Sequence, residues 1–553
     1  MKLTAIKKCL KYNTLFFRVA KKYTKQTIYL FILSLVSVFL YFPAPMLIQN
    51  LIDDLYKLGF TKQELYIQTG VLLILMLISL AVSYLISLYI IKIRRDYIIE
   101  IKRVIYNTVL HADYSALNKI PETDIQARST RDVSAIQYLT PIGVSNFFVE
   151  IIKLILISII LIYNNFQLTM LILIMVPAAY GAFKLSSASL YSLSKRTHET
   201  YSEYNSSILE TFSSVRECQI DSSYAYHAKK IQECIDENED AGMKFSIINR
   251  KIQSLMGIIP LLITVMVWGV GGAHIIEGTM TVGEIVSYMI YLSMFYSPAR
   301  YMFELMANLN FDISAVERVE QVLKLEQIDT TKNQQLFVEN ISINIRDIGF
   351  SYGPSMIFNK LNFNIKSGEK ICITGSNGSG KTTLVNIILG LIKPDYGHIK
   401  VDGHDISKCD LTSYRKLLGY VPQNVFIYRD TFNNNITLGK EFEEHKIYMV
   451  LQQVGLTELY NKYKKNESLF IHEKNISGGM KQKIGIARAL LKEPKLLIMD
   501  EPTNHLDNKT MLQVIDIISK SHSMSVIYIA HDLNLQNKAD RCLTLVGGKL
   551  IEK

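Results

Sequence analysis

Six long apolar blocks in the first 300 residues constrain the fold of this chain more than any other feature. They lie at residues 27–48, 65–91, 147–163, 168–183, 255–276 and 285–298. A helix needs about 20 mostly apolar residues to cross the hydrocarbon core of a bilayer, and tilt or extension into solvent shifts its apparent ends. The recurrence of these blocks favours six membrane spans over buried helices of a soluble protein. Only residues 164–167 separate the third and fourth blocks, which predicts a tight helical hairpin.

The composition agrees with a membrane part followed by a soluble domain. Apolar residues make up 49% of the chain and its mean hydropathy is +0.16, but they are concentrated in the first 300 residues. The net charge is +10, which alone would allow a nucleic-acid partner. However, residues 1–26 carry eight Lys or Arg and no acid, and this basic segment precedes an apolar block. Such a pattern fits the cytosolic side of a membrane, so no nucleic-acid partner is expected.

The charges near the ends of the spans predict the orientation. The connection between the first two blocks is slightly acidic, whereas basic residues flank the inner ends of the spans. These basic residues are Lys92, Arg94, Arg95, Lys184, Arg250 and Lys251. Positive residues are retained on the cytosolic side. We therefore expect a multi-pass protein of the bacterial cytoplasmic (inner) membrane with both termini in the cytosol, in contact with membrane lipids.

The two inner connections, about 55 and 70 residues long, are charged but still periodic. In residues 93–106, for example, apolar side chains recur at helical spacing between Arg, Asp and Lys. We expect both connections to be pairs of long helices that extend out of the membrane.

The second half of the chain contains a loop that is typical of phosphate binding. The run Gly375-Ser376-Asn377-Gly378-Ser379-Gly380-Lys381-Thr382 stands between the apolar strand 371–374 and a helix that begins near Thr383. In this context backbone N–H groups and the helix N-terminus converge on nucleotide phosphates. Lys381 is expected to contact the β- and γ-phosphates of ATP, and the Thr382 hydroxyl to bind Mg²⁺.

Two acids end another apolar strand, residues 496–499. We expect Asp500 to support the Mg²⁺ ion and Glu501 to orient or deprotonate the attacking water, because phosphoryl transfer depends on positioning and charge neutralisation. The alternative for Glu501 is a solvated acid at the start of a helix. Together these patterns predict an α/β P-loop ATPase domain behind an α-helical membrane domain of six spans.

The run Ile476-Ser477-Gly478-Gly479-Met480 lies between the loop and the acidic strand. In this order the parts resemble the nucleotide-binding domain of ATP-binding-cassette (ABC) proteins, over roughly residues 336–553. The resemblance implies a helical subdomain, and it implies that Ser477, Gly478 and Gly479 reach across a dimer to the γ-phosphate of a nucleotide held by the partner.

The same resemblance implies roles for residues outside the loop. Gln423 would contact Mg²⁺ and sense the membrane domain, His531 would contact the γ-phosphate, and Asp507 would lie along the dimer interface. Tyr352 would stack on adenine, although an aromatic side chain there is equally suited to packing.

The membrane half is similar to the transmembrane domain of exporter-type ABC proteins. The similarity lies in residues 113–117 with Arg128 and Asp132, in Glu210 with residues 215–216, and in the glycine-containing runs 269–272 and 278–283. It implies short coupling helices near residues 113–119 and 210–216, which press onto the nucleotide-binding domains. We expect the membrane domain at residues 1–325, a linker at 326–338 and the ATPase domain at 339–553.

Several positions depart from the family pattern. Met480 replaces the usual Gln, Lys483 stands where Arg is common, and the chain between Glu473 and Ile476 is about two residues short. The expected terminal helices after residues 547–551 are missing as well. Communication through the shortened loop is therefore in question, while the ATPase core is expected to be complete.

The resemblance implies ATP-driven export by two such chains. A homodimer is expected because every catalytic position is filled, and a heterodimer with a degenerate partner is the alternative. Tyr and Met side chains in the spans favour an amphipathic cargo, and the short chain is similar to exporters of small modified peptides such as bacteriocins. Lipid or multidrug export comes second, followed by import through the same fold and a non-transport ABC ATPase. Arg300, just after Pro298, is a candidate cargo-cavity residue or an arginine at the membrane interface.

Overall fold

The chain folds into two compact units of different architecture. The computed structural model describes residues 15–328, 335–336, 338, 341–464, 470–471, 475–503, 508–520, 524–530 and 532–552. Residues 1–107 and 122–324 form a helical unit, and residues 108–121 and 325–553 form a mixed unit of strands and helices.

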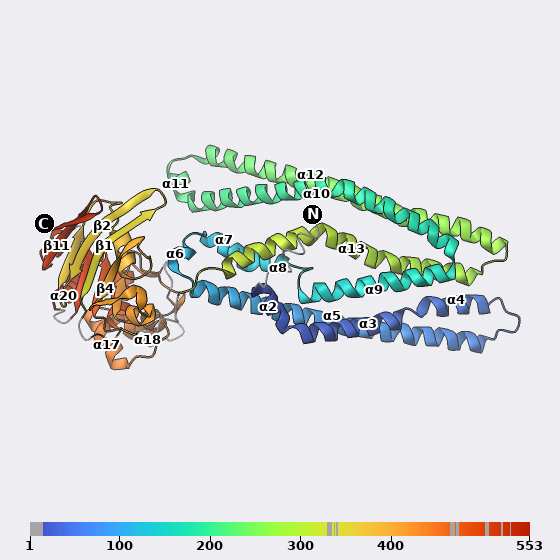
Figure 1. Ribbon diagram of the computed structural model, residues 1–553, viewed down its shortest axis with the longest axis horizontal. Coiled ribbons are helices and arrows are strands. Elements are labelled where there is room, and N and C mark those ends of the chain that lie inside the picture. Colours follow the sequence, from blue (N-terminus) through green and yellow to red (C-terminus); the bar gives the residue numbers. More distant parts are fainter. Residues whose placement is uncertain are drawn as a thin grey trace. The chain divides into compact units, whose positions relative to one another are not determined.

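Long helices dominate the helical unit (Figure 1). In chain order its elements are α2 (Leu15–Lys22), α3 (Thr24–Tyr41), α4 (Ala44–Asp54), α5 (Lys62–Leu110), α7 (Glu122–Ala127), the π-helical turn η1 (Arg128–Asp132), α8 (Val133–Ala135), α9 (Pro141–Asn164), α10 (Phe166–Ser213), α11 (Val215–Ile220), α12 (Tyr224–Ile276) and α13 (Val282–Leu323). Helices α5, α10, α12 and α13 contain 49, 48, 53 and 42 residues. They therefore continue well beyond the predicted apolar blocks, as expected for the inner connections.

The predicted spans agree with these helices where side chains are described. Three helical segments are long and apolar enough to cross a membrane, namely Thr24–Asp54, Lys62–Leu110 and Pro141–Asn164, and they contain the first three blocks. A shorter apolar helix, Pro260–Ile276, covers most of the fifth block. The side chains of residues 171–180, in the fourth block, lie outside the described part. The sixth block lies within α13.

The first inner connection differs from the prediction of two long helices. After α5 the chain forms the short helices α6 (Tyr114–Leu117), α7, η1 and α8 before α9 begins. The Asp312 Oδ2 accepts backbone N–H groups of residues 137, 138 and 139 at 3.0, 2.6 and 3.1 Å. Thr140 then caps α9, and Pro141 occupies its first turn. Proline disfavours helical geometry at the preceding residue, and Asp312 satisfies the N–H groups that the break exposes.

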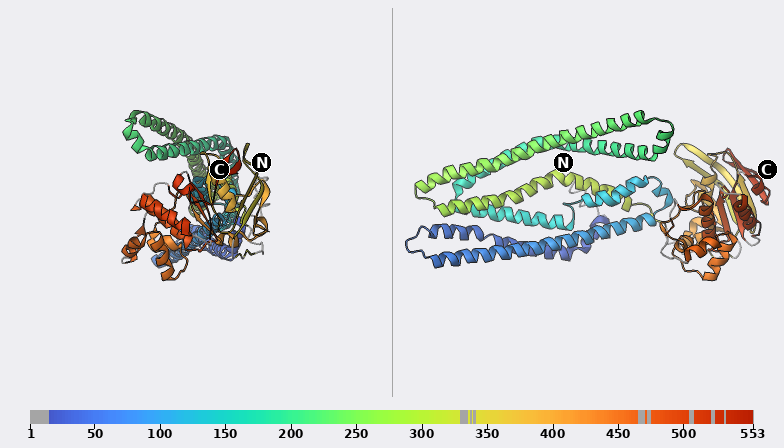
Figure 2. Two further views of the ribbon diagram at one scale, coloured as in Figure 1. Left: turned by 90° about the vertical axis from the view of Figure 1, so that its left-hand side faces the viewer. Right: turned by 180° about the vertical axis from the view of Figure 1, so that it is seen from behind.

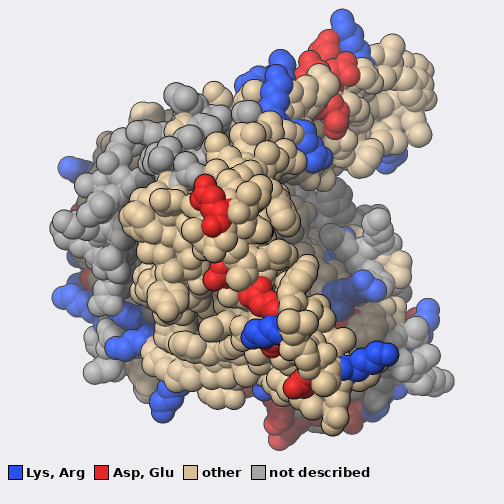
Figure 3. Space-filling model, turned by 90° about the vertical axis from the view of Figure 1, so that its right-hand side faces the viewer, with Lys and Arg blue, Asp and Glu red and all other residues tan. Residues whose placement is uncertain are grey.

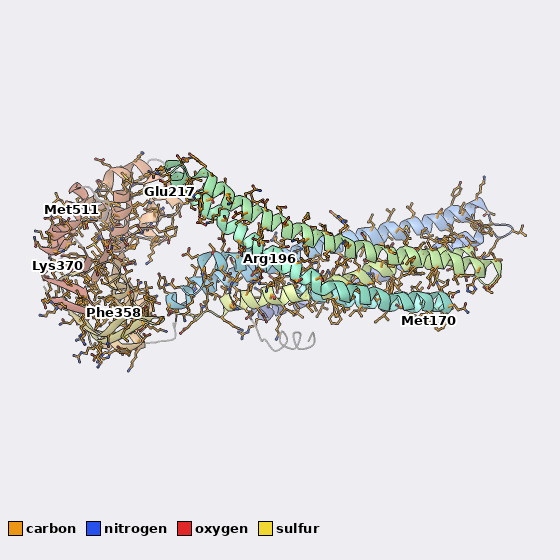
Figure 4. All side chains as sticks on the ribbon, turned by 90° about the horizontal axis from the view of Figure 1, so that it is seen from above. Met170, Arg196, Glu217, Phe358, Lys370 and Met511 are labelled. Atoms are coloured by element: carbon orange, nitrogen blue, oxygen red, sulfur yellow. The ribbon has the colours of Figure 1, made fainter. Side chains whose placement is uncertain are left out.

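Helices α10 and α12 run side by side along most of their length (Figures 1 and 2). Ion pairs connect their solvent-exposed parts: Arg196, labelled in Figure 4, pairs with Glu237, and the Lys230 Nζ lies 2.9 Å from the Glu210 Oε2. Helix α13 packs against α9 and α4. Most of the surface at the end where the helix hairpins turn carries neither acidic nor basic residues (Figure 3).

Aromatic side chains of α13 belong to the apolar core near these hairpin turns. Tyr288 is fully buried and its hydroxyl lies 2.9 Å from the Thr169 hydroxyl. The Tyr291 hydroxyl donates to the Phe42 carbonyl at 2.8 Å. The aromatic residues of this span thus pack within the protein.

The mixed unit contains two larger sheets and a helical layer. Its strands are β1 (Ile343–Tyr352), β2 (Ser355–Ile365), β3 (Lys370–Thr374), β4 (Tyr396–Val401), β5 (His404–Asp405), β6 (Leu418–Val421), β7 (Asp430–Thr431), β8 (Phe470–Ile471), β9 (Leu496–Asp500), β10 (Ser525–Ile529), β11 (Arg541–Val546) and β12 (Lys549–Glu552). Its helices are α6, α14 (Lys381–Ile388), the 3₁₀ turn η2 (Ile406–Lys408), α15 (Leu411–Lys416), α16 (Phe432–Thr437), α17 (Glu444–Gln453), α18 (Thr457–Lys464), α19 (Gly478–Leu490), α20 (Asn508–Lys520) and α21 (Leu533–Gln536).

The six-stranded sheet positions the predicted site. Its order is β12-β11-β3-β10-β9-β6, and the strands from β11 to β6 are parallel neighbours. Strands β9 and β10 are buried along their whole length, as expected for parallel strands covered on both faces. Ile529 is paired with both Ile373 and Asp500. The carboxyl ends of β3 and β9 therefore lie at the same edge of the sheet.

The other sheet is antiparallel, in the order β2-β1-β4-β5, and shares an apolar core with α14. A second apolar core joins α16–α19 to the other side of the parallel sheet, through side chains such as Phe432, Leu451 and Ile484. The predicted fold class is confirmed: a helical membrane unit is fused to an α/β unit with a helical subdomain.

Candidate active site

The glycine-rich loop connects the central strand β3 to the N-terminus of α14. Gly375 and Gly380 both have positive φ angles, +151° and +102°. A Cβ on Gly375 would lie 2.8 Å from the Leu545 carbonyl oxygen, and one on Gly380 would lie 2.7 Å from the Ile357 Cγ2. Both positions therefore require glycine on grounds of conformation and of space.

Lys381 begins α14 and turns back over the loop. Its side chain is 8% exposed, and its ammonium donates to the carbonyl oxygens of Gly375 at 2.7 Å and Ser376 at 3.0 Å. The Ser379 Oγ is buried and has no hydrogen-bond partner among the described residues. A buried cation next to an unsatisfied hydroxyl at a helix N-terminus fits an anionic phosphate group.

Asp500 lies at the carboxyl end of β9 and is 5% exposed. Burial raises the pKa of Asp500 and the charge of Glu501 adds to this increase, while the Lys381 ammonium and a hydrogen bond with Thr382 oppose it. The predicted Mg²⁺ ligands Thr382 and Asp500 are thus in contact. A hydroxyl and a carboxylate are oxygen ligands of the kind that Mg²⁺ takes in phosphate sites, where it binds few protein groups. These residues therefore fit the ion.

Glu501 follows Asp500 in a backbone conformation that is uncommon for a residue with a side chain. Its φ is +48°, and its N–H donates to the Ile529 carbonyl at 3.1 Å. The Gln423 Nε2 donates to the Glu501 Oε2 at 2.6 Å. Non-glycine residues held in this region are often found at functional sites, where the surrounding structure imposes the conformation.

The serine-glycine-glycine run occupies the N-terminus of α19. The Ser477 Oγ caps this helix by accepting the Met480 N–H at 3.3 Å, and both Ser477 and Gly478 are exposed. In the described part of the chain, no hydrogen bond connects Ser477 to the glycine-rich loop. Met480 is 39% exposed, so this departure from the family pattern places an apolar side chain at the surface beside Ser477.

Tyr352 lies at the end of β1, is 52% exposed, and packs edge-on against Phe350 with ring centres 4.8 Å apart. Thr383 is buried in the first turn of α14. The remaining loop residues, Asn377 and Gly378, lie in the turn between β3 and α14. His531 and Asp507 lie outside the described residues.

One neighbour of the site was missed from the sequence. The side chain of Tyr420, on β6, is partly buried and packs against the apolar core that the two sheets share. Burial raises the pKa of Tyr420 to about 12, and the nearby charges of Asp500 and Tyr114 act in the same direction. The only signal in the sequence was an aromatic residue in a short strand, which does not distinguish packing from proximity to a site.

Tyr114 belongs to α6, the first predicted coupling helix, which forms part of the mixed unit. The Asp113 N–H donates to the Glu326 carbonyl at 2.7 Å, and the Ile328 N–H donates to the His111 carbonyl at 2.8 Å. Burial lowers the pKa of Arg415, and the nearby Asp113 opposes this decrease. Asp113 and Tyr114 thus lie near α15 and β6, and β6 is the strand that leads to Gln423.

Comparisons with known proteins agree with this geometry. Residues 27–299 match the ABC transporter transmembrane region, and residues 358–504 match the ABC transporter family of ATP-binding domains. A provisionally named export ATP-binding/permease protein of Rickettsia typhi is 27% identical over 97% of this chain and 95% of its own length.

Other relatives carry more specific names. An ATP-dependent lipid A-core flippase of Syntrophus aciditrophicus is 27% identical over 92% of this chain and 85% of its own length. The lactococcin-A transport/processing ATP-binding protein of Lactococcus lactis subsp. lactis is 26% identical over 76% of this chain and 59% of its own length.

The fold also matches a solved structure. It is that of a bacterial Atm1-family ABC exporter with ATP bound, which is 18% identical, has a TM-score of 0.84, and is matched over 96% of this chain and 95% of the other. The ATP-binding domain identifies an ATPase coupled to transport. With both domains fused in one polypeptide, the chain belongs to the ABC transporter family and is of the export type.

Proposed function

We propose that this exporter uses ATP hydrolysis to move an amphipathic cargo, a small modified peptide of the bacteriocin kind, out across the bacterial cytoplasmic membrane. The observation that supports this most is the convergence of Lys381, Thr382 and Asp500 at one sheet edge, in a chain whose other half is a transmembrane region. The proposed limits are residues 1–325 for the membrane domain, 326–338 for the linker and 339–553 for the ATPase domain.

The glycine-rich loop binds the ATP phosphates. Lys381 exchanges its two carbonyl partners for phosphate oxygens, and the buried Ser379 hydroxyl gains an acceptor. Tyr352 offers a half-exposed ring to the adenine. Thr382, Asp500 and Gln423 would hold Mg²⁺, which would neutralise phosphate charge when bound.

Glu501 orients and deprotonates the attacking water. Gln423 donates a hydrogen bond to the Glu501 Oε2, and the backbone of Glu501 has a positive φ angle. Together these two features fix the position of the carboxylate and leave its Oε1 to act on the water. His531 and Asp507 are assigned to the γ-phosphate and to the dimer interface by family resemblance alone. Hydrolysis therefore depends on positioned charge and on one carboxylate.

Two chains act together in this proposal. Within the described residues no hydrogen bond joins Ser477, Gly478 or Gly479 to the loop of their own chain. As a largely exposed helix N-terminus they are suited to a γ-phosphate held by a second chain. A homodimer follows because each chain carries a complete set of catalytic residue types. A heterodimer with a degenerate partner is the alternative.

The cargo class is supported by similarity to the lactococcin-A transporter, whose name specifies a peptide. The lipid A-core flippase supports a lipid cargo instead. Both cargo classes are amphipathic, which fits the apolar spans with their few polar groups. Peptide export is our first proposal and lipid or drug export is the second.

Reconstitution with both cargo classes separates these proposals. Purified protein is placed in one batch of proteoliposomes, and ATP-dependent uptake of a fluorescent lanthionine peptide and ATP-dependent flipping of a fluorescent lipid are both measured. Peptide uptake without lipid flipping supports the first proposal. Lipid flipping alone replaces it with the second, and the absence of both in a protein that hydrolyses ATP rejects an amphipathic cargo.

A further inference from the structure

Helix α9 carries two charged residues within an apolar span. Its apolar window has a mean hydropathy of 2.2, yet Glu150 and Lys153 lie one turn apart, with the Lys153 Nζ 2.8 Å from the Glu150 Oε1. Charged side chains in a membrane span are costly and are usually retained where they face protein or a water-filled cavity. This pair therefore needs an explanation beyond the stability of the helix.

Lys153 lies inside the predicted span 147–163 and not at its end. It is eleven residues before Asn164, the last residue of α9, and six residues after residue 147. At a rise of 1.5 Å per residue these separations are about 16 Å and about 9 Å, which places Lys153 in the inner half of the span. The contact with Glu150 directs its ammonium along the helix toward the inner end.

Lys153 also lies on the face of α9 that packs within the protein. Residues four apart on this face, Ser145, Val149, Ile157 and Leu161, are only 2%, 4%, 1% and 2% exposed. Lys153 continues the same series, yet its side chain is 31% exposed. Lys153 is therefore the one partly exposed side chain in this otherwise buried series of described residues.

The hydrogen-bonding capacity of the Glu150–Lys153 ion pair is only partly used. The Glu150 Oε2 is buried and has no hydrogen-bond partner among the described residues. A buried ion pair stabilises a protein only when its remaining polar atoms are also satisfied. Lys153 has three N–H donors, of which the contact with Glu150 uses one. The ammonium thus has further donors that a ligand could use.

We propose that Lys153 binds an anionic group of the cargo in the inner half of the membrane span, and that Glu150 positions its ammonium. The group is a carboxylate or a phosphate on an otherwise apolar molecule, which describes both a peptide with a free carboxyl end and a phospholipid. This inference rests on the proposed export function and specifies what its cargo must carry.

The test uses matched anionic and neutral probes with the full-length protein in phosphatidylcholine nanodiscs. One pair is a synthetic apolar decapeptide with a free C-terminal carboxylate and the same peptide with a C-terminal amide. The other pair is dodecyl phosphate and dodecanol. The measured quantity is the probe concentration that gives half-maximal stimulation of ATP hydrolysis, relative to each variant's own rate without probe.

The wild type is expected to respond to at least one anionic probe at a concentration about tenfold lower than to its neutral match. Lys153→Met removes this preference and Lys153→Arg retains it. Glu150→Gln weakens it only in part, because an amide oxygen still accepts a hydrogen bond from the ammonium but holds it less firmly. The double substitution Glu150→Lys/Lys153→Glu keeps an ion pair but reverses its polarity, and it is expected to behave like Lys153→Met.

Three outcomes overturn the proposal: no anionic preference in the wild type, an unchanged preference in Lys153→Met, or its recovery in the charge-reversed double variant. If the charge-reversed variant recovers the anionic preference, and Glu150→Gln and Lys153→Met lose it equally, the pair has a structural role. The peptide and phosphate probes distinguish the two sources of the anion. ATP-driven uptake of the free-carboxylate peptide that is unchanged in Lys153→Met rejects this inference alone, whereas absence of peptide uptake in the wild type rejects the export of peptides.

Discussion

The Gln423 Nε2 lies 2.6 Å from the Glu501 Oε2, and the two residues follow the neighbouring parallel strands β6 and β9. Strand β6 also carries Tyr420, which lies close to both Asp500 and Tyr114 of α6. Within the mixed unit, β6 therefore connects the surroundings of α6 to the residue that holds the carboxylate we assign to hydrolysis.

Glu501→Gln is expected to reduce ATP turnover by about 100-fold or more, because the carboxylate acts on water. ATP binding should be preserved, since Lys381 and the loop are unchanged. Steady-state hydrolysis and binding of a fluorescent ATP analogue in nanodiscs measure the two effects. Hydrolysis at the wild-type rate in the variant would refute the role of Glu501.

Ser477 is expected to act on the nucleotide of the partner chain. Chains with Ser477→Arg and chains with Lys381→Ala are inactive alone, but a heterodimer of the two places both defects in one composite site and leaves the other intact. Partial ATP hydrolysis should return when both are co-expressed and purified through two different tags. Heterodimers that remain as inactive as either homodimer would contradict the arrangement.

Gly380→Ala and Gly378→Ala form a matched pair, because both glycines have positive φ angles, +102° and +79°. A Cβ at Gly380 would overlap Ile357, whereas a Cβ at Gly378 meets no atom within 4 Å. Gly380→Ala is therefore expected to destabilise the protein by about 1–3 kcal/mol and to abolish ATP binding. Gly378→Ala should cost about 1 kcal/mol from backbone strain. Thermal unfolding with and without ATP measures the stability and the ATP binding of both variants. Equal losses of stability in the two variants would argue against the predicted overlap at Gly380.

Asp500→Asn is expected to raise the melting temperature of the nucleotide-free protein at neutral pH while removing Mg²⁺-dependent hydrolysis. Burial raises the pKa of Asp500, so its ionised form opposes folding, and this penalty is present above the raised pKa and disappears as the pH falls below it. The difference in melting temperature between the variant and the wild type should therefore shrink as the pH is lowered. A difference that is independent of pH would indicate another cause.

The local parts of the site could be predicted from the sequence. The glycine-rich loop and the acids after β9 depend on short runs whose chemistry is contained in neighbouring residues. The buried parallel strands likewise appear as continuous apolar runs between loop residues. Resemblance to a family suggests what spacing alone does not show, such as the role proposed for Ser477.

Other features depend on contacts between distant parts of the chain. The break before α9 requires Asp312, more than 170 residues later, to accept the exposed N–H groups. The partial exposure of Lys153 depends on how α9 packs, and the sequence shows only two charges in an apolar block. The proximity of α6 to β6 similarly arises from tertiary packing, which periodicity does not report.

ATP-driven uptake of a modified amphipathic peptide into inside-out proteoliposomes tests the central claim most directly. We predict accumulation above the external concentration with ATP and Mg²⁺ in the wild type, and none with Glu501→Gln or with a non-hydrolysable ATP analogue. Equal peptide levels in the wild-type and Glu501→Gln vesicles, in preparations where the wild type hydrolyses ATP, would contradict the account.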